Sequence, residues 1–266
     1  MLASMPQLET IDKGRCTPTH PAPLLFVHGG CHAAWCWDAG FLDFFADKGF
    51  RAVAVSLRHH GNSSGDRSLH RCSIADYVED VKAAADDLDT SPVVVGHSMG
   101  GFIVQRYLED HWAPAAVLMA SLPPSGVRGA TSRFVRKHPL VALRSNFSGR
   151  PQLIFQQPLT REALFSPGTP QPVVDDCAGR VEAESMRALW FDVLFRLPKP
   201  EQVSTPMLVL GGSADGSVTT DEVHATARAY RSTGELFPDM GHNMMLEPGW
   251  PAVAHRIEEW LGGRGM

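Results

Sequence analysis

The sequence lacks several features that would mark particular classes of protein. No apolar run approaches the length needed to span a membrane. No run of Lys or Arg stands out and the formal net charge is -5, so we expect neither a nucleic-acid nor a membrane partner. The first 13 residues lack a cationic start followed by an apolar run, so we expect no signal peptide and a cytoplasmic protein.

Cysteine is scarce and scattered. The five cysteines are an odd number, which argues against a disulfide framework, and none forms a CxxC pair or a Cys/His cluster with zinc spacing. We therefore expect free thiols and no metal site. The cysteines are Cys16, Cys31, Cys36, Cys72 and Cys177.

What is present is the profile of an ordinary globular protein of 266 residues, with 44% hydrophobic and 20% charged residues. Short apolar runs alternate with stretches of helical periodicity, which predicts a doubly wound, mostly parallel sheet of α/β class. Ser73 and Asp76 resemble a helix-capping pair. Strands are expected at 23–27, 51–57, 92–96, 115–120, 206–211 and 235–237, and helices at 34–48, 73–88, 99–110, 220–229 and 250–261.

The alternation stops between residues 122 and 199, a stretch that opens and closes with Pro-rich sequence. A loop of this length without structure would be unusual in a compact domain, so we expect an inserted helical cap. Residues 1–121 and 200–266 then form the core. Short helices are expected at 131–138, 160–165 and 181–195.

Residues 96–101 read Gly-His-Ser-Met-Gly-Gly and lie between an expected strand and an expected helix. This is the G-x-S-x-G pattern of a nucleophilic serine on a sharp strand-to-helix turn, where glycines two positions away let strand and helix approach. The helix N-terminus and nearby amides stabilise negative charge there. Ser98 is the predicted nucleophile, although a Gly-rich turn could hold a serine by chance.

A serine nucleophile needs a base, and the base needs an orienting acid. Asp215 and His242 each follow an expected strand, where catalytic groups gather in open α/β sheets. We therefore assign Asp215 as the acid and His242 as the base among twelve histidines. Asp221 is the competing acid, but it is placed like a helix-start residue.

The turn His28-Gly29-Gly30-Cys31 follows the first predicted parallel strand. Gly-rich turns at this position expose backbone N–H groups toward the serine. We therefore expect the amides of Gly30 and Met99 to form an oxyanion hole. The same glycines would also suit a tight turn with no catalytic part.

Together these motifs resemble the α/β-hydrolase superfamily of serine-esterase type, over nearly the whole chain. Residues 58–63, Arg-His-His-Gly-Asn-Ser, also look like its R-G-H-G-x-S turn, with His59 where glycine is usual. Residues 28–37 are similar to a stretch of the plant methylesterase and hydroxynitrile lyase family. The lyases carry threonine and lysine at the positions of Gly29 and Asn243, so the resemblance implies ester hydrolysis.

The expected function is hydrolysis of an ester of a small, mainly hydrophobic substrate through an acyl-enzyme on Ser98, without metal or organic cofactor. Thioester, lactone or carbon–carbon hydrolysis and perhydrolysis use the same triad, and a lyase or a ligand-binding receptor on this scaffold are further alternatives. The oligomeric state stays open. Candidate pocket residues, which core packing explains equally well, are Cys31, His32, Phe165, Trp190, Phe191 and Leu194.

Overall fold

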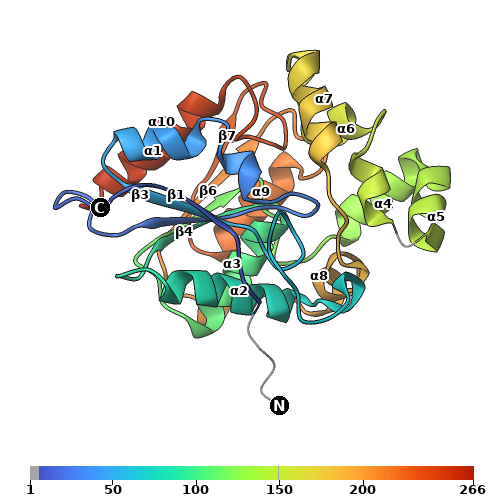
Figure 1. The fold of residues 1–266 in the computed structure, drawn as a ribbon. Helices are drawn as coiled ribbons and strands as arrows, with labels where there is room; N and C mark the ends of the chain where they lie inside the picture. Colours follow the sequence, from blue (N-terminus) through green and yellow to red (C-terminus); the bar gives the residue numbers. More distant parts are fainter. Residues whose placement is uncertain (1–5, 149) are drawn as a thin grey trace.

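One seven-stranded sheet runs through the computed structural model, which describes residues 6–148 and 150–266 (Figure 1). The strand order is β1-β3-β2-β4-β5-β6-β7, and every neighbouring pair is parallel except β1 with β3. The expected doubly wound α/β fold is thereby confirmed. The strands are β1 (Thr10–Gly14), β2 (Leu24–Val27), β3 (Arg51–Val55), β4 (Val93–His97), β5 (Ala116–Met119), β6 (Met207–Gly212) and β7 (Gly234–Phe237). The antiparallel edge strand β1, a polar segment, was missed by the sequence analysis.

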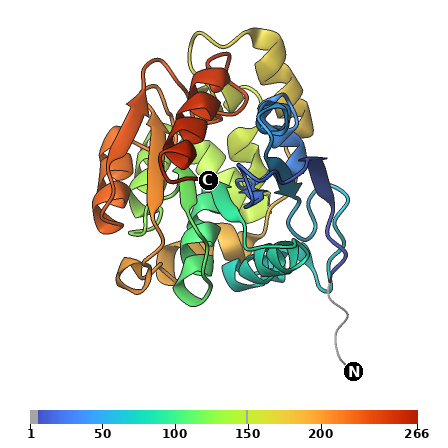
Figure 2. The ribbon, with the colours of Figure 1, turned by 90° about the vertical axis from the view of Figure 1, so that its left-hand side faces the viewer.

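Helices cover both faces of the sheet, which explains why its central strands β4 and β5 are buried along their whole length (Figures 1 and 2). Successive side chains point to opposite faces, so Val94 joins one buried cluster while Val93 and Val95 join the other. The helices α1 (Phe41–Asp47) and α10 (Trp250–Gly262) contribute to the second cluster. The first cluster includes side chains of α2 (Ile74–Asp86), α3 (Met99–Asp110) and α9 (Thr220–Ala229).

Helix boundaries follow local sequence signals in two instructive cases. The capping box expected before α2 is present, since the Asp76 amide donates to Ser73 Oγ at 3.1 Å and the Ser73 amide donates back to the Asp76 carboxylate at 2.8 Å. The helix expected over 34–48 is wrong as one element. It divides into a 3₁₀ turn η1 (Ala34–Trp37) and α1, because Gly40 between them adopts a left-handed conformation with φ of 113°.

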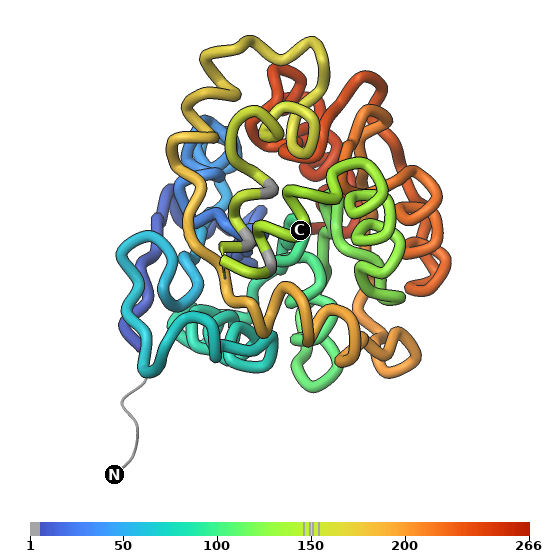
Figure 3. Tube along the Cα trace, turned by 90° about the vertical axis from the view of Figure 1, so that its right-hand side faces the viewer, coloured from blue at the N-terminus to red at the C-terminus, as the bar shows by residue number. Residues whose placement is uncertain are grey.

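The long connection between β5 and β6 is largely helical, and we call residues 122–199 the insert (Figure 3). Two helices there were not expected, α5 and α7, and the helix expected over 181–195 is wrong for its first third. Residues 181–185 are not helical, because Glu182 and Glu184 are bonded to the turn after β2. The elements are α4 (Arg128–Lys137), α5 (Pro139–Ser148), η3 (Pro151–Phe155), α6 (Thr160–Leu164), α7 (Gln171–Arg180), the π-helix η4 (Arg187–Asp192) and α8 (Val193–Phe195).

A buried ion pair ties the loop after β3 to helix α2. The Arg58 guanidinium donates to the Asp80 carboxylate at 2.6 and 2.9 Å, and the Arg58 amide donates to the same carboxylate at 2.9 Å. The Asp80 side chain is fully buried and that of Arg58 nearly so. Asp66 and Asp76 lie farther from the guanidinium, at 3.4 and 3.5 Å. Asp80 therefore supplies most of the compensation for burying this cation.

The substitution Asp80→Ala is expected to lower the free energy of unfolding by about 3 kcal/mol, because it leaves a buried guanidinium without its main partner. Urea denaturation measures the change. Asp89→Ala is the matched control, since Asp89 pairs with Arg51 at 3.3 Å but its side chain is 94% exposed. If both substitutions changed the free energy of unfolding equally, the burial of the Arg58–Asp80 pair would not be the reason for its contribution.

Candidate active site

Ser98 occupies a strained turn between β4 and α3. Its backbone has φ of 53° and ψ of -119°, a conformation that non-glycine residues rarely adopt. Gly100 makes the turn sterically possible, because a Cβ on it would lie 2.3 Å from the carbonyl oxygen of His28. A Cβ on Gly96 would likewise lie 2.6 Å from the Gly100 carbonyl oxygen. The glycines thus let β4, α3 and the turn after β2 approach one another around the serine.

Three side chains from three strand ends form a continuous chain of hydrogen bonds. His242 Nε2 lies 2.9 Å from Ser98 Oγ, and His242 Nδ1 lies 2.8 Å from Asp215 Oδ2. The Asp215 carboxylate also accepts the amides of Ser217 and Val218, at 2.7 and 2.9 Å. A carboxylate held this way accepts a hydrogen bond from Nδ1–H of the imidazole, which leaves Nε2 free to accept the serine proton. The structure therefore brings together all three residues that the sequence analysis assigned to catalysis.

Two residues beside Ser98, Met99 and Gly30, have backbone amides without an acceptor among the described residues. Met99 is the first residue of α3, so its amide has no acceptor within the helix. Gly30 lies in the turn after β2, and among the described residues no hydrogen-bond acceptor is found for its amide. Both residues line the cavity that contains Ser98. Unpaired amides at this place can stabilise negative charge on a bound oxygen.

A buried carboxylate from the insert holds the turn that carries Gly30. Glu184 Oε2 accepts the Cys31 amide at 3.1 Å, while the Cys31 carbonyl accepts the Glu182 amide at 2.9 Å. Cys31 itself has a left-handed backbone, with φ of 63°. The backbone N–H and C=O of Cys31, the residue after Gly30, are therefore both bonded to residues about 150 positions away in the sequence.

Glu184 is charged despite complete burial. It forms an ion pair with His60 at 3.2 Å and accepts the Tyr77 hydroxyl at 2.7 Å. Burial alone would raise the pKa of Glu184, but the attraction of His60 and these hydrogen bonds outweigh it and hold the pKa at about 2. The same ion pair raises the pKa of His60 above its ordinary value against the opposing effect of burial. Glu184 is a residue that no local sequence motif indicated.

His32 supports the same turn from another side. Its Nδ1 donates to the Gly30 carbonyl at 2.9 Å and its Nε2 accepts the side-chain amide of Asn243 at 3.1 Å. The ring stacks on Trp35, with 5.3 Å between centroids. Burial lowers the pKa of His32 to about 4. A neutral imidazole thus links the Gly30 turn to the residue that follows His242.

The insert is also hydrogen-bonded to the loop that carries His242. The Glu247 carboxylate accepts the Gly241 amide at 3.1 Å, and from the insert it accepts the Ser166 amide at 2.5 Å and the Thr169 hydroxyl at 2.6 Å. The Asn243 amide donates to the Leu164 carbonyl at 2.8 Å. Asn243 is therefore bonded to the insert directly and Gly241 through Glu247, a second residue that the sequence analysis missed.

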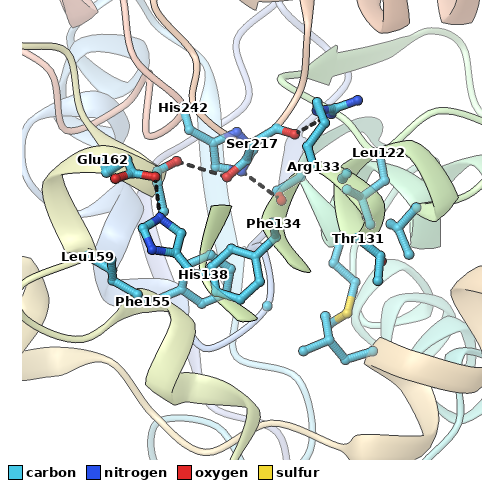
Figure 4. Close-up of a pocket in the computed structure, with 18 of the residues that line it drawn as sticks. Leu122, Thr131, Arg133, Phe134, His138, Phe155, Leu159, Glu162, Ser217 and His242 are labelled. Atoms are coloured by element: carbon cyan, nitrogen blue, oxygen red, sulfur yellow. Dashed lines mark hydrogen bonds and ion pairs between the residues drawn. The ribbon is translucent and has the colours of Figure 1, made fainter. Parts of the chain in front are cut away.

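A cavity of about 430 Å³ lies between Ser98 and the insert (Figure 4). Its wall is mostly apolar, with a polar group formed by His138 and Glu162, whose Nε2 and Oε1 lie 2.7 Å apart. Its lining includes Leu122, Val127, Phe134, Phe155, Leu159, Leu189 and Trp190. Within the described ranges, no cluster of three or more His, Cys, Asp or Glu side chains could hold a metal ion.

Of the six candidate pocket residues, the structure places Trp190 alone on the cavity wall. Cys31 and His32 lie behind the turn, where they position its backbone. Phe165 packs inside a small buried cluster of the insert, and Leu194 packs against the main core. Phe191 is 51% exposed and packs against Phe195 with the two rings tilted. The expectation that these five residues line the cavity is therefore corrected. For Phe191 and Leu194 the reason is that 181–185 is not helical, which changes the faces that the following helical residues present.

A model of the Alpha/beta hydrolase family matches residues 24–254. The chain is 39% identical over 113 residues to the bifunctional esterase/perhydrolase of Acinetobacter calcoaceticus, covering 40% of each protein. It is 30% identical over 115 residues to Methylesterase 10 of Arabidopsis thaliana, covering 36% of this chain and 41% of that protein. The matches thus span less than half of these relatives. The fold is similar to that of a thermophilic esterase from Thermogutta terrifontis, with TM-score 0.78 and 23% identity over 97% of this chain and 94% of that one.

Stability is expected to fall as the pH falls from 6.5 toward 4. The pKa of His32 is about 4 in the folded protein and about 6.5 when unfolded. The unfolded chain therefore binds more protons over this interval, which favours unfolding. Burial lowers the pKa of His28, to about 3, and that of His97 in the same direction.

Urea denaturation of His32→Asn at several pH values tests this account. The variant should show a weaker dependence on pH between 4 and 6.5 than the wild type. The control is His70→Asn, since His70 is exposed at the surface. If His32→Asn had the same pH dependence of the free energy of unfolding as the wild type, protonation of His32 would not destabilise the folded protein.

Proposed function

The chain belongs to the alpha/beta hydrolase family, and we propose that it is a serine esterase that forms an acyl-enzyme on Ser98. One observation carries the proposal, the unbroken chain of hydrogen bonds from Asp215 through His242 to Ser98 at the floor of the cavity. Each member has the partner that its role requires. The reaction needs no group beyond these side chains and two backbone amides.

Acylation begins when His242 Nε2 takes the proton of Ser98 Oγ as the oxygen attacks the ester carbonyl. Asp215 keeps the imidazole in the tautomer with hydrogen on Nδ1 and stabilises the imidazolium that forms. The carbonyl oxygen becomes an oxyanion, which the amides of Gly30 and Met99 receive. Each such donor contributes a factor on the order of 10²–10³ in rate.

Collapse of the tetrahedral intermediate breaks the bond to the alcohol oxygen, which takes the proton from His242. Water then replaces the alcohol. His242 removes a proton from this water, which attacks the acyl carbon, and the serine oxygen leaves with the returned proton. The acid is released and the three residues regain their starting states.

The cavity indicates the size and polarity of the substrate. A volume of about 430 Å³ with aromatic and aliphatic walls suits a small, mainly hydrophobic acyl or alkyl group. We propose that the insert is the cap of the site, because its helices supply Phe134, Phe155 and Trp190 to the wall opposite Ser98. Substrate selection then depends on the insert rather than on the sheet.

Two features disfavour the cyanohydrin lyase reaction. A Cβ on Gly29 would lie 3.0 Å from Ser98 Cβ and 2.9 Å from His97 Nδ1, so the threonine of the lyases would crowd the nucleophile. Asn243 occupies the lyase lysine position and is fully buried, with its side-chain amide bonded to His32. An asparagine at this position supplies no cation to receive a cyanide ion.

Perhydrolysis is a second candidate reaction, favoured by the similarity to a bifunctional esterase/perhydrolase. Hydrogen peroxide would replace water in the second half of the reaction, and the product would be a peracid. The acyl-enzyme is common to both reactions. Peracid formation in the presence of peroxide, measured against acid formation, separates them.

Ser98→Ala is expected to reduce the hydrolysis of p-nitrophenyl esters by roughly 10⁴-fold or more, since removing one member of a triad abolishes its combined action. Steady-state release of p-nitrophenol across acyl chain lengths measures the loss, and the preferred length reports the cavity size. Ser64→Ala is the control, because Ser64 is exposed and bonded to the N-terminal segment at Gln7.

An activated phosphonate ester should label Ser98 in the wild type and leave the Ser98→Ala variant unlabelled, as mass spectrometry of the peptide would show. Turnover that survives Ser98→Ala would overturn the assignment of the nucleophile. Absence of both turnover and labelling in folded wild type would overturn the proposed function itself.

Glu184→Ala is expected to lower kcat on the order of tenfold with little change in KM, because it releases the Cys31 peptide and so displaces the Gly30 amide. Glu184→Gln should recover most of the loss, since its side-chain oxygen can still accept that amide. Tyr77→Phe is the matched control. It removes a hydrogen bond to the other carboxylate oxygen and leaves the one to Cys31.

Inhibition by an alkyl boronic acid distinguishes positioning from general loss of structure. Its tetrahedral adduct with Ser98 places an oxygen between the two amides, so Glu184→Ala should weaken inhibition by about the factor lost in kcat. Unchanged inhibition alongside a reduced kcat would show that Glu184 does not act through the amide of Gly30.

A further inference from the structure

Helix α5 exposes an apolar face that nothing in the proposed function uses. Leu140, Leu143 and Phe147 are 79, 56 and 84% exposed. Their spacing of three and four residues places them on the same side of the helix. Val135 on the neighbouring helix α4 is 45% exposed. Large apolar side chains gathered on one exposed face mark an interaction surface more often than a random surface does.

The same part of the insert carries a strong excess of positive charge. Residues 122–150 contain six of the 24 Lys and Arg residues and none of the 29 Asp and Glu residues. The rest of the chain then has 18 cationic and 29 anionic residues, a net charge of -11. We expected no membrane partner because the overall charge is -5, but this total hides the cationic segment at 122–150.

Several of these charges are unpaired within the part of the chain that the structure describes. Arg133 pairs with Glu222 at 2.8 Å and Lys137 with Glu162 at 3.0 Å. No ion pair is found there for Arg136 or Arg144, and both are exposed. Arg144 lies among the apolar side chains of α5, one residue from Leu143.

We propose that the exposed face of α4 and α5 binds the surface of an anionic lipid bilayer. Leucine and phenylalanine side chains would enter the acyl-chain boundary, and the guanidinium groups would contact lipid phosphates. A helix lying in a membrane surface is distinct from one that spans it. None of the helices in the described ranges has the length and apolar character to span a bilayer.

The charge pattern favours this partner over a second copy of the chain. A symmetric dimer would place the same patch on both subunits, so cationic segments would face each other. A nucleic acid would pair with the cationic side chains but would leave the apolar side chains at 140, 143 and 147 exposed to water. An anionic bilayer satisfies both at once.

The location of the patch gives the binding a consequence. Phe134 of α4 and His138, which follows this helix, line the cavity, and α4 and α5 form the outer edge of the insert (Figures 1 and 3). Docking would bring the cavity close to the lipid. This consequence, unlike the docking itself, rests on the proposed function, and it favours esters dissolved in the bilayer over esters free in water.

The test is flotation of the full chain with vesicles. The wild type should float with vesicles of phosphatidylglycerol and phosphatidylcholine, float poorly with phosphatidylcholine alone, and dissociate as salt is raised. Two variants should each reduce binding about tenfold or more. One is the charge variant Arg136→Glu with Arg144→Glu, and the other is the apolar variant Leu140→Ser, Leu143→Ser and Phe147→Ser.

Matched controls carry the same changes on exposed residues elsewhere. They are Arg15→Glu with Arg231→Glu, and Trp112→Ser, since Trp112 is 67% exposed outside the insert. Both controls should bind like the wild type. None of the variants alters the cavity lining, so hydrolysis of a soluble p-nitrophenyl ester should be unchanged in all of them.

Absence of wild-type flotation, equal binding to neutral vesicles, or binding that survives both variants would overturn the docking proposal. So would a dimer in sedimentation that the apolar variant dissociates, because the patch would then bind a second copy. Flotation requires no turnover, so its outcome is independent of whether the soluble ester is hydrolysed. Each proposal can fail without the other.

Discussion

The site depends first on a backbone constraint, the positive φ of Ser98 between β4 and α3. A residue with a side chain is held there only because the surrounding chain leaves no alternative. The contact of Gly100 with the His28 carbonyl presses the turn after β2 against the start of α3. The turn at Ser98 thus brings the proposed nucleophile, the N-terminus of α3 and the turn after β2 close together.

The sheet and the insert contribute different parts of the site. Parallel strands deliver Ser98, Asp215 and His242 to one edge of the sheet. Two buried carboxylates then fix the backbone around them. Glu184 of the insert holds the turn after β2, and Glu247 of the core joins the loop of His242 to Ser166 of the insert. The proposed catalytic groups therefore come from the core, while the positions of the surrounding amides depend on the insert.

The parts predicted from sequence were those encoded locally. The helices at 99–110 and 220–229 and the turn at Ser98 carry periodicity, caps and glycines within a few residues of one another. The long-range contacts were missed. Glu184 binds a backbone 153 residues away, and its acidic neighbourhood resembles any solvated segment. For the same reason the irregular chain at 181–185 was read as helix, since local propensity could not register the tertiary bonds that override it.

The bond between Glu184 and Cys31 has a consequence for how such a protein can diversify. Under the proposed function the insert supplies the wall that selects the substrate, so changes there would alter specificity. Yet Glu182 and Glu184 of the same segment hold the turn after β2 in place. Variation is therefore less restricted in α4 and α5 than at this short stretch or at residues 164–169, which are bonded to the loop of His242. A graft of the whole insert would change the cavity wall and also remove both supports, whereas a graft confined to α4 and α5 would change the wall and leave them in place.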